Sequence, residues 1–487
     1  MRVSLQSSSL VLALMAMPMA SAEKVLGAFI FARHGDRTPK VLSDTQLTDL
    51  GYQEVYLAGS YYHDRYISST SSLQIAGISE EIVDQNQITA SAPSDKVLQN
   101  SATGFLQGVY PPVGTSASQT LGNGSSVSAP LNGYQLIPLE ITDTNAGSED
   151  NTWLQDATGC SKAVVSSNNY YTSSLYNSLL DSTKDFYGSL SPVLNSTFTE
   201  SKMTFKNAYT IFDYLNVGWI HNSTSDIPSS ELLTSDVRHQ LLVLANSHEY
   251  NLAYNESETI RAIAGSTLAA SVLKGLNKTI TSKAKTKLNV EFGAYATFLS
   301  YFGLAQLPSV DVAFTGIPDY ASSMTWELVT NSTSDEFPST SEISVRFLFH
   351  NGTITGTSTP TEYPLYGQSS TTIPWSDFVD QTNKIAVTSK DEWCQVCGNT
   401  DGECASASSS SSGSDSSANA DSVSSKSGGM SKAVAGVVGA MVTLAVILGL
   451  QAIFFFVGGF RITKKRNVAP PKEEVSIVTE AEDVSKV

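Results

Sequence analysis

Basic side chains are scarce in this sequence. Its 487 residues include 29 Lys and Arg against 46 Asp and Glu, which gives a formal net charge of -17. Proteins that bind nucleic acids neutralise phosphates with Lys and Arg, so this balance argues against a nucleic-acid partner. A small anionic ligand is still compatible with the sequence, because a local group of arginines can oppose the field of the whole molecule.

Charge is absent altogether from residues 433–460. A helix of that length is about 42 Å long, so it can span a bilayer core of roughly 30 Å with some tilt. The basic cluster within 461–466 predicts that residues 461–487 form a cytoplasmic tail. A GPI signal is the alternative, but its apolar tail would end the chain, and here polar residues follow the apolar run.

The N-terminal residues 1–22 have the pattern of a secretory signal peptide, with Arg2, an apolar run and small residues at the end. Residues 405–432 contain almost only Ser, Gly, Ala and Asp, which predicts a disordered stalk. We therefore expect an ectodomain outside the cell, at the plasma membrane or cell surface. Asn-X-Ser/Thr sequons support a glycosylated ectodomain and begin at Asn123, Asn195, Asn222, Asn255, Asn277, Asn331 and Asn351.

Cysteine is rare, with four residues in the chain: Cys160, Cys394, Cys397 and Cys404. In an oxidising compartment an even number predicts two disulfides, and the sequence leaves three pairings open. The short spacing of the last three cysteines also suits zinc, although the exported context favours disulfides. We predict that all four cysteines are oxidised and that no metal is bound.

Strand and helix patterns alternate within the expected ectodomain, residues 23–404. Residues 25–32 resemble a buried strand, and 44–66 place apolar residues such as Leu47, Leu50 and Val55 at helical spacing. Two later segments, 260–276 and 288–305, predict a helix and then a strand that turns into a helix. The sequence therefore predicts an α/β fold, with a central mixed sheet flanked by helices and a smaller, mostly helical insert at about 115–250.

The strand at 25–32 runs directly into the stretch Arg33-His34-Gly35-Asp36-Arg37-Thr38-Pro39. Ligands in open α/β sheets bind at the carboxyl ends of strands, so cations at this place predict an anion site. Guanidinium groups match phosphate oxygens in pairs. Gly35 lets the backbone approach closely, and Pro39 fixes the turn.

This stretch matches the Arg-His-Gly-X-Arg-X-Pro signature of the histidine acid phosphatases, a branch of the histidine phosphatase superfamily. Residues 46–66, 101–112 and 318–328 also resemble segments of that family, and the chain looks like a fungal-type, membrane-anchored member. The resemblance implies phosphomonoester hydrolysis, with His34 as the nucleophile that forms a phosphohistidine and Arg33 and Arg37 as the phosphate clamp. It also implies no metal or cofactor, because arginines supply the electrostatic stabilisation.

The second half of the family site is degenerate. The family has a third arginine ahead of the helix that resembles 101–112, and here Ala90 aligns with it, with Asp95 and Lys96 nearby. Where the family has a His-Asp pair, this chain has Tyr295 and Ala296. That aspartate protonates the leaving oxygen, and loss of a general acid slows such reactions by about 10²–10⁴-fold.

Other residues offer weak substitutes for the missing acid. His248 and Glu249 resemble the donor of the phytase-like branch, but they precede the helix at 260–276, whereas the donor follows it. A solvated helix face is the simpler interpretation of that pair. Asp36 lies inside the signature, and Tyr295 is a weak acid with a pKa of about 10. The lone histidines, which we assign to surface or core packing, are His63, His221, His239 and His350.

Two functions remain open from the sequence. The retained signature supports a slow acid phosphatase, and Ala90, Tyr295 and Ala296 support a phosphate-binding surface protein, sensor or scaffold without useful hydrolysis. A phosphomonoester or phosphate is the expected ligand in both cases.

The predicted topology can be tested on intact cells that carry a C-terminal tag. External protease should digest the ectodomain and spare the tag, because residues 461–487 are expected in the cytoplasm. Permeabilised cells are the control, in which the tag should also be lost. Loss of the tag from intact cells would contradict the orientation.

Overall fold

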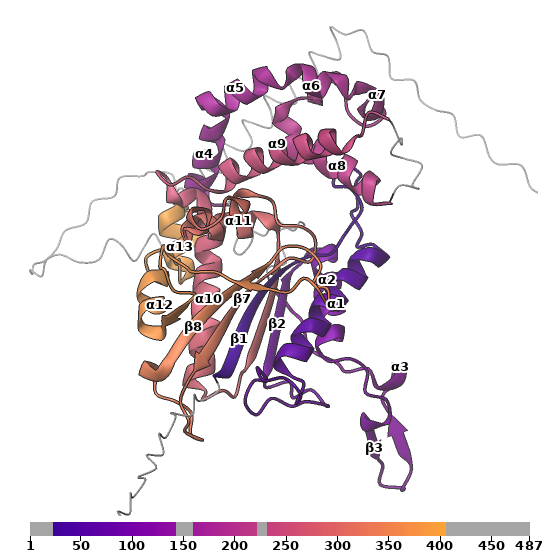
Figure 1. Cartoon of the computed structure of the whole chain (residues 1–487), viewed down its shortest axis with the longest axis vertical. Helices are drawn as coiled ribbons and strands as arrows, with labels where there is room; N and C mark the ends of the chain where they lie inside the picture. The colour runs from indigo at the N-terminus through magenta and orange to yellow at the C-terminus, as the bar shows by residue number, and fades with distance from the viewer. Residues whose placement is uncertain (1–22, 143–158, 222–230, 406–487) are drawn as a thin grey trace, which may run out of the picture. The chain divides into compact units, whose positions relative to one another are not determined.

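The computed structural model describes residues 23–142, 159–221 and 231–405 (Figure 1). The expected signal peptide, the stalk beyond Ala405, the apolar segment 433–460 and the tail lie outside these residues, as does Asn222. Within the described ranges, no helix is both long enough and apolar enough to cross a membrane.

A mixed sheet forms the centre of the fold, in the order β10-β8-β7-β1-β6-β2-β5, with β9 paired to β8. β1 is parallel to β6 and antiparallel to β7, and β6, β2 and β5 are parallel. This confirms the predicted α/β class with a mixed sheet. The strands are β1 Lys24–Arg33, β2 Ile88–Pro93, β5 Glu140–Thr142, β6 Leu288–Gly293, β7 Ser323–Thr330, β8 Ile343–His350, β9 Thr361–Glu362 and β10 Thr372–Pro374.

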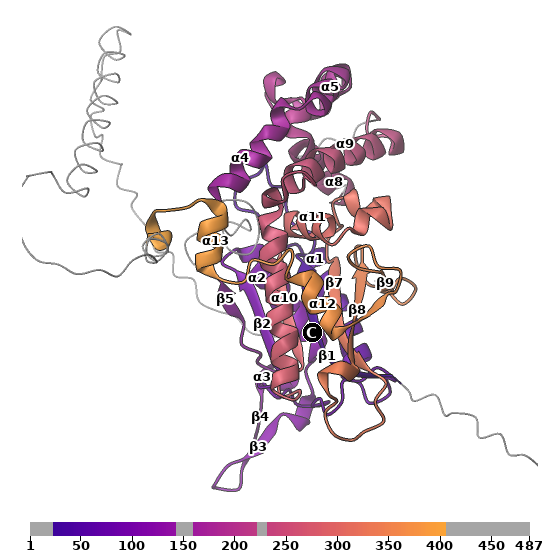
Figure 2. The same cartoon turned by 90° about the vertical axis from the view of Figure 1, so that its left-hand side faces the viewer.

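Helices cover both faces of this sheet, because side chains of β1 alternate between two apolar clusters. Ala28 and Ile30 pack with α1 and α2, whereas Phe29 and Phe31 face α10, α11 and α12 (Figure 2). The helices are α1 Asp49–Tyr66, α2 Lys96–Val109, α10 Ile263–Thr281, α11 Tyr295–Leu304 and α12 Trp375–Thr382.

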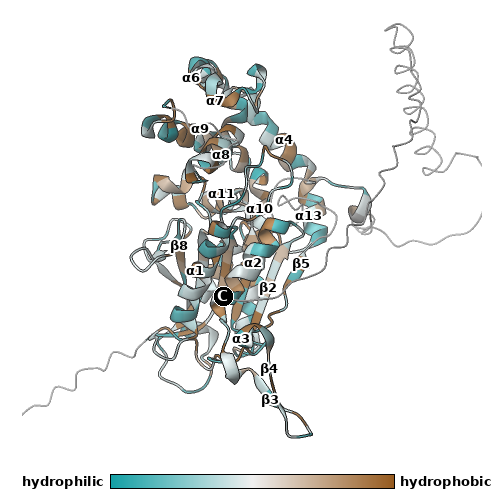
Figure 3. Cartoon of the chain, turned by 90° about the vertical axis from the view of Figure 1, so that its right-hand side faces the viewer, coloured by the Kyte–Doolittle hydropathy of each residue, from teal (hydrophilic) through white to brown (hydrophobic). Residues whose placement is uncertain are grey.

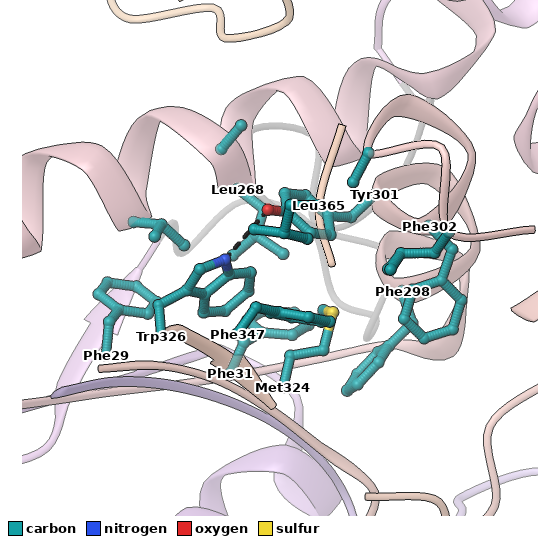
Figure 4. Close-up of a cluster of buried hydrophobic side chains, with 14 of the residues drawn as sticks. Phe29, Phe31, Leu268, Phe298, Tyr301, Phe302, Met324, Trp326, Phe347 and Leu365 are labelled. Atoms are coloured by element: carbon teal, nitrogen blue, oxygen red, sulfur yellow. Dashed lines mark hydrogen bonds between the residues drawn. The ribbon is translucent and has the colours of Figure 1, made fainter. Parts of the chain in front are cut away.

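Aromatic rings dominate the cluster on the α10 side of the sheet (Figure 4). Trp326 of β7 is fully buried, and its indole N–H donates to the Tyr301 hydroxyl at 3.0 Å. Phe29 meets the Trp326 ring edge-on, at 5.9 Å between centroids. Such pairs add to the free energy gained by burial, so this cluster fixes the position of α11 on the sheet.

Periodicity predicted the principal elements around β1. The helix expected within 44–66 is α1, which begins after Thr48, whose hydroxyl accepts the Gly51 N–H. Val55 lies in the core as expected, but Leu50 is 39% exposed, although its neighbour Gly51 is buried. The strand-to-helix turn predicted at 288–305 is confirmed by β6 and α11.

Six helices form a separate layer beyond the carboxyl end of β1 (Figure 1). They have an apolar core of their own, built mainly from tyrosine, phenylalanine and leucine side chains. Figure 3 shows hydrophilic and hydrophobic segments mixed along α8 and α9, as expected of helices that bury one side. The six are α4 Ser161–Asn169, α5 Ser174–Ser182, α6 Lys184–Ser189, α7 Ser191–Leu194, α8 Ala208–His221 and α9 Ser235–Ala253.

The first part of the expected insert at 115–250 is extended rather than helical. Asn123 and Gly124 form the turn of a hairpin, and Gly124 has a φ of 84°, which favours glycine there. Strand β5 then joins the central sheet next to β2. The hairpin strands and the short helix after them are β3 Ser118–Thr120, β4 Ser126–Ser128 and α3 Pro130–Gly133.

The four cysteines lie in two disulfide pairs, Cys160 with Cys397 and Cys394 with Cys404. This selects one of the three pairings that the sequence left open. Cys160 precedes α4 and Cys397 ends α13 (Lys390–Cys397), so the longer link ties the beginning of the helical layer to the C-terminal part of the ectodomain.

A buried carboxylate joins α1 to the antiparallel half of the sheet. Glu327 of β7 is fully buried and lies 2.7 Å from Arg65, and it accepts the Tyr66 hydroxyl at 2.6 Å and the Arg346 Nε–H at 2.7 Å. Burial alone would raise the pKa of Glu327, but the charges and hydrogen bonds of Arg65 and Arg346 hold it below its usual range.

We predict that Glu327→Gln lowers the free energy of unfolding by about 3–5 kcal/mol at neutral pH, since it removes the carboxylate that pairs with Arg65 and the most deeply buried of the three carboxylates around Arg346. Because the folded pKa is lowered, this stabilisation is present above the ordinary pKa of 4.5 and is lost as the pH falls. The difference between the wild type and the variant should therefore shrink in acid. Denaturant titrations at several pH values measure it.

The control for this prediction is Glu362→Gln. Glu362 is 41% exposed and lies 3.5 Å from Arg346, and an exposed pair contributes under about 1 kcal/mol. Equal losses in the two variants, or a difference that does not change with pH, would contradict the role assigned to Glu327.

Candidate active site

The signature loop leaves the carboxyl end of β1 and is enclosed between the sheet and the helical layer. Its charged side chains are almost completely buried: Arg33 is 4% exposed, His34 0%, Asp36 0% and Arg37 1%. Buried charges require partners, and those partners determine what the site can bind.

The backbone of the signature lies directly against α1 and α2. The Gly35 N–H donates to the Ser101 hydroxyl at 3.2 Å, and a Cβ at position 35 would lie 2.1 Å from the Gly51 carbonyl oxygen. Only glycine fits this contact. The predicted close approach of Gly35 is therefore made to helix α1.

His34 has the hydrogen bond that prepares an imidazole for nucleophilic attack. Its Nδ1 lies 2.8 Å from the Gly35 carbonyl oxygen. A carbonyl oxygen only accepts, so Nδ1 carries the proton and Nε2 carries the lone pair in the neutral ring. The Tyr320 ring lies beside the imidazole, at 5.6 Å between centroids.

Arg37 forms a buried ion pair with Asp213 of α8. Its Nη1 lies 3.1 Å from Asp213 Oδ1, and the carboxylate is 3% exposed. Arg37 also donates to the Thr38 carbonyl at 3.0 Å and to the Tyr209 hydroxyl at 3.2 Å. The carboxylate of Asp213 is therefore bound to the same guanidinium that the family resemblance assigns to phosphate binding.

Arg33 lies between two aromatic rings. Its Cζ is 4.7 Å from the centroid of Tyr320 and 5.4 Å from that of Tyr295, and its Nη1–H donates to the Pro318 carbonyl. Burial raises the pKa of Tyr209 to about 12 and that of Tyr320 well above its usual value, despite the opposing charge of Arg37. These phenols stay protonated, and their rings enclose the cations.

Helix α11 begins with the two residues that replace the family's His-Asp pair. The Tyr295 hydroxyl donates to Glu249 Oε2 at 2.7 Å, and Glu249 Oε1 lies 2.7 Å from His248 Nδ1. Ala296 is partly buried against the apolar cluster and carries no ionisable group. The only carboxylate placed at Tyr295 by these contacts is therefore Glu249, which accepts the tyrosine's hydrogen bond.

The interpretation of His248 and Glu249 as a solvated helix face is wrong for His248. Its side chain is 4% exposed, since it fits into a cage of aromatic rings in the helical layer. The rings come from α5 and from the segments before α5 and α8. They belong to Tyr170, Tyr171, Tyr176 and Phe205.

Ala90 does not lie at the edge of the sheet with the signature. It pairs with Val290, which is level with Ile30, three residues before Arg33 along β1. Its side chain belongs to the apolar cluster under α1 and α2.

His221 is a residue of the site that sequence reasoning assigned to packing. Its Nε2 lies 2.7 Å from Asp36 Oδ2, which also accepts the Thr48 hydroxyl at 2.5 Å. Glu54 of α1 accepts the Asp36 N–H at 2.7 Å. The pKa of Glu54 is raised to about 7, mainly because the carboxyl group is buried. The hydrogen bond from the Asp36 N–H opposes this rise, and the negative charge of Asp36 adds to it.

Comparison with known proteins identifies the family. A model of the histidine phosphatase superfamily (branch 2) matches residues 41–350, and the chain belongs to this family. The matched region begins just after the signature and contains α1, the helical layer and α11. No curated protein matches the chain.

Solved phytases share the fold. A phytase from Klebsiella sp. ASR1 has a TM-score of 0.52 at 13% identity, over 75% of this chain and 95% of that one. A Hafnia alvei phytase in complex with myo-inositol hexakis sulphate has a TM-score of 0.50 at 13% identity, over 77% of this chain and 99% of that one. Identity this low establishes common architecture only.

We predict that Gly35→Ala destabilises the protein by about 1–3 kcal/mol or more, because the added methyl group overlaps the backbone of α1. Urea titration of the ectodomain measures this. Gly188→Ala is the matched control: a Cβ there meets nothing within 4 Å, and alanine favours the helix. Equal stability of the two variants would show that the loop does not depend on the contact with Gly51.

Proposed function

We propose that the chain is a cell-surface histidine phosphatase whose phosphate site is closed by its own helical layer, so that it hydrolyses phosphomonoesters slowly. The observation that carries this proposal is the buried ion pair between Arg37 and Asp213. The carboxylate takes the place on Arg37 that a phosphoryl oxygen would need.

The ion pair makes phosphate binding costly. A phosphate that takes Arg37 leaves Asp213 buried without its counter-charge, and separation of such a pair costs about 3–5 kcal/mol. That corresponds to roughly a hundredfold to several-thousandfold in affinity. Arg33, held between Tyr295 and Tyr320, then contributes most of the remaining attraction.

The chemical step lacks an acid as well. An alkoxide leaving group needs a proton, and Ala296 has none to give. The Tyr295 hydroxyl is directed to Glu249, and a phenol is a weak acid. Aryl esters leave without much protonation, so they are the substrates least affected.

The phosphomonoester class and the surface location have different support. The family and the phytase fold support a phosphate ester, and the sulphated inositol in the Hafnia alvei phytase supports a polyanionic ligand. The signal-like N-terminus, the sequons and the apolar segment 433–460 support a membrane-anchored ectodomain.

Active hydrolysis is the second candidate function, and the hydrogen bond from His34 Nδ1 to Gly35 favours it. It presents Nε2 as the nucleophile, which a purely structural histidine does not need. In this alternative Glu249 is the donor nearest to the start of α11.

Initial rates at acid pH on an alkyl ester, glycerol phosphate, and an aryl ester, nitrophenyl phosphate, test the proposal. We expect the wild type to hydrolyse the alkyl ester at least 100-fold more slowly than Tyr295→His/Ala296→Asp, consistent with the loss of a general acid. The aryl ester should show a smaller difference. Position 90 is left unchanged, because its side chain faces the apolar cluster.

Phosphate affinity, measured by calorimetry, tests the closure. Asp213→Asn keeps the shape but removes the competing charge, and it should tighten phosphate binding at least tenfold. Glu258→Gln, which removes a carboxylate 3.7 Å from the buried Arg261, should leave the affinity unchanged.

Two results would contradict these assignments. If the wild type matches Tyr295→His/Ala296→Asp on the alkyl ester, a proton donor exists in the wild type. If His34→Ala changes neither the rates nor the phosphate affinity, the site assignment fails.

A further inference from the structure

A cavity of about 560 Å³ is lined by residues of α10 and α12. Figure 2 shows these two helices side by side on the face of the sheet away from α1 and α2. None of the cavity's lining residues belongs to the signature site. The size is within the range of sites that bind small organic molecules, about 300–1,000 Å³. Its lining comprises Thr267, Ala270, Ser271, Leu273, Lys274, Asn277, Trp375, Val379, Val387 and Thr388.

The lining combines an apolar wall with polar groups at intervals. Trp375 and Val379 of α12 face Leu273 of α10, and hydroxyl and ammonium groups come from Ser271 and Lys274. Sugar rings have this same character, with an apolar face of C–H groups and hydroxyls around the edge. An aromatic ring supplies a flat surface for such a face, and the polar groups bind the hydroxyls.

Asn277 is a candidate glycan attachment site in the lining of the cavity, which is hereafter called the groove. It lines the cavity from α10, its side chain is exposed, and it begins the sequon Asn277-Lys278-Thr279. Thr279 is completely buried, so in the folded protein the sequon presents its asparagine alone. A glycan attached to Asn277 therefore begins inside the groove.

We propose that the N-linked glycan of Asn277 folds back into this groove and links α10 to α12. This rests on the export that the proposed function includes. In the modification, the Asn277 amide nitrogen loses a proton and bonds to C1 of N-acetylglucosamine, and C1 releases the diphosphate of the lipid-linked donor. The first sugars then lie against Trp375 and Val379, within reach of Lys274 and Ser271.

Among the described residues, two other sequons line cavities that are about half the size or smaller. Asn331 lines a smaller cavity of about 280 Å³ that contains no aromatic residue. Asn351 lines one of about 230 Å³, and its side-chain oxygen already accepts the Asp319 N–H at 2.8 Å. Asn331 is exposed, which makes it the internal control for Asn277.

The test uses the full chain produced through a secretory pathway and measures, site by site, the release of glycans by a peptide N-glycosidase. From native protein, we expect release at Asn277 to be at least tenfold slower than at Asn331, because the packed sugars shield the linkage. After denaturation the two rates should be equal. Equal rates in the native protein would overturn the proposal.

Variants show whether slow release at Asn277 comes from sugars packed in the groove or from poor access of the glycosidase to that part of the surface. Ser271→Trp fills the groove and should raise the native release rate at Asn277 to that at Asn331. Asn277→Gln removes the glycan at an exposed side chain and should lower the Tm, whereas Asn331→Gln removes the control glycan and should not. A Ser271→Trp variant with unchanged slow release would overturn the proposal.

Glycan occupancy separates this proposal from the proposed location. If Asn331 is glycosylated and Asn277 is not, the groove assignment alone fails. If none of the sequons is glycosylated in the natural host, the surface location fails and the groove assignment fails with it. Mass spectrometry of the peptides distinguishes these results.

Discussion

The buried ion pair between Arg37 and Asp213 connects the sheet to the helical layer of this protein. Arg37 belongs to the loop after β1, whereas Asp213 belongs to α8. Neither charge can be buried alone, so the helical layer must sit over the carboxyl end of β1 for either side chain to be satisfied. The same carboxylate accepts the Lys40 N–H at 2.8 Å, which fixes the exit of the loop.

This dependence means that the fold itself requires the signature loop. Loss of Arg37 would leave Asp213 unpaired in the interior, and any side chain at Gly35 would collide with α1. The loop is therefore required by the fold whether or not it meets a phosphate. Position 296 carries no such constraint, since its alanine only packs against the apolar cluster.

Residues near β1 were predictable from the sequence because local patterns determine them. The alternation of β1, the cap at Thr48 and the turn into α11 all follow from spacing. Asp213 and His221 were not, because they reach the site from α8, which has no motif in common with the signature. Glu249 of α9 was a candidate acid from the sequence, but its contact with Tyr295 of α11 joins residues far apart in the chain and does not follow from spacing. The hairpin that contains Gly124 was missed because the whole segment was expected to be mostly helical.

The contacts of the cationic side chains in the signature also determine how strongly the loop can attract an anion. The sequence suggests clustered cations in the signature, but Asp213 neutralises Arg37. Arg33 differs from Arg37, because its buried Nε has no hydrogen-bond partner among the described residues. The faces of Tyr295 and Tyr320 attract this cation but repel an anion. An anion at Arg33 would therefore compete with these two rings, just as an anion at Arg37 would compete with Asp213.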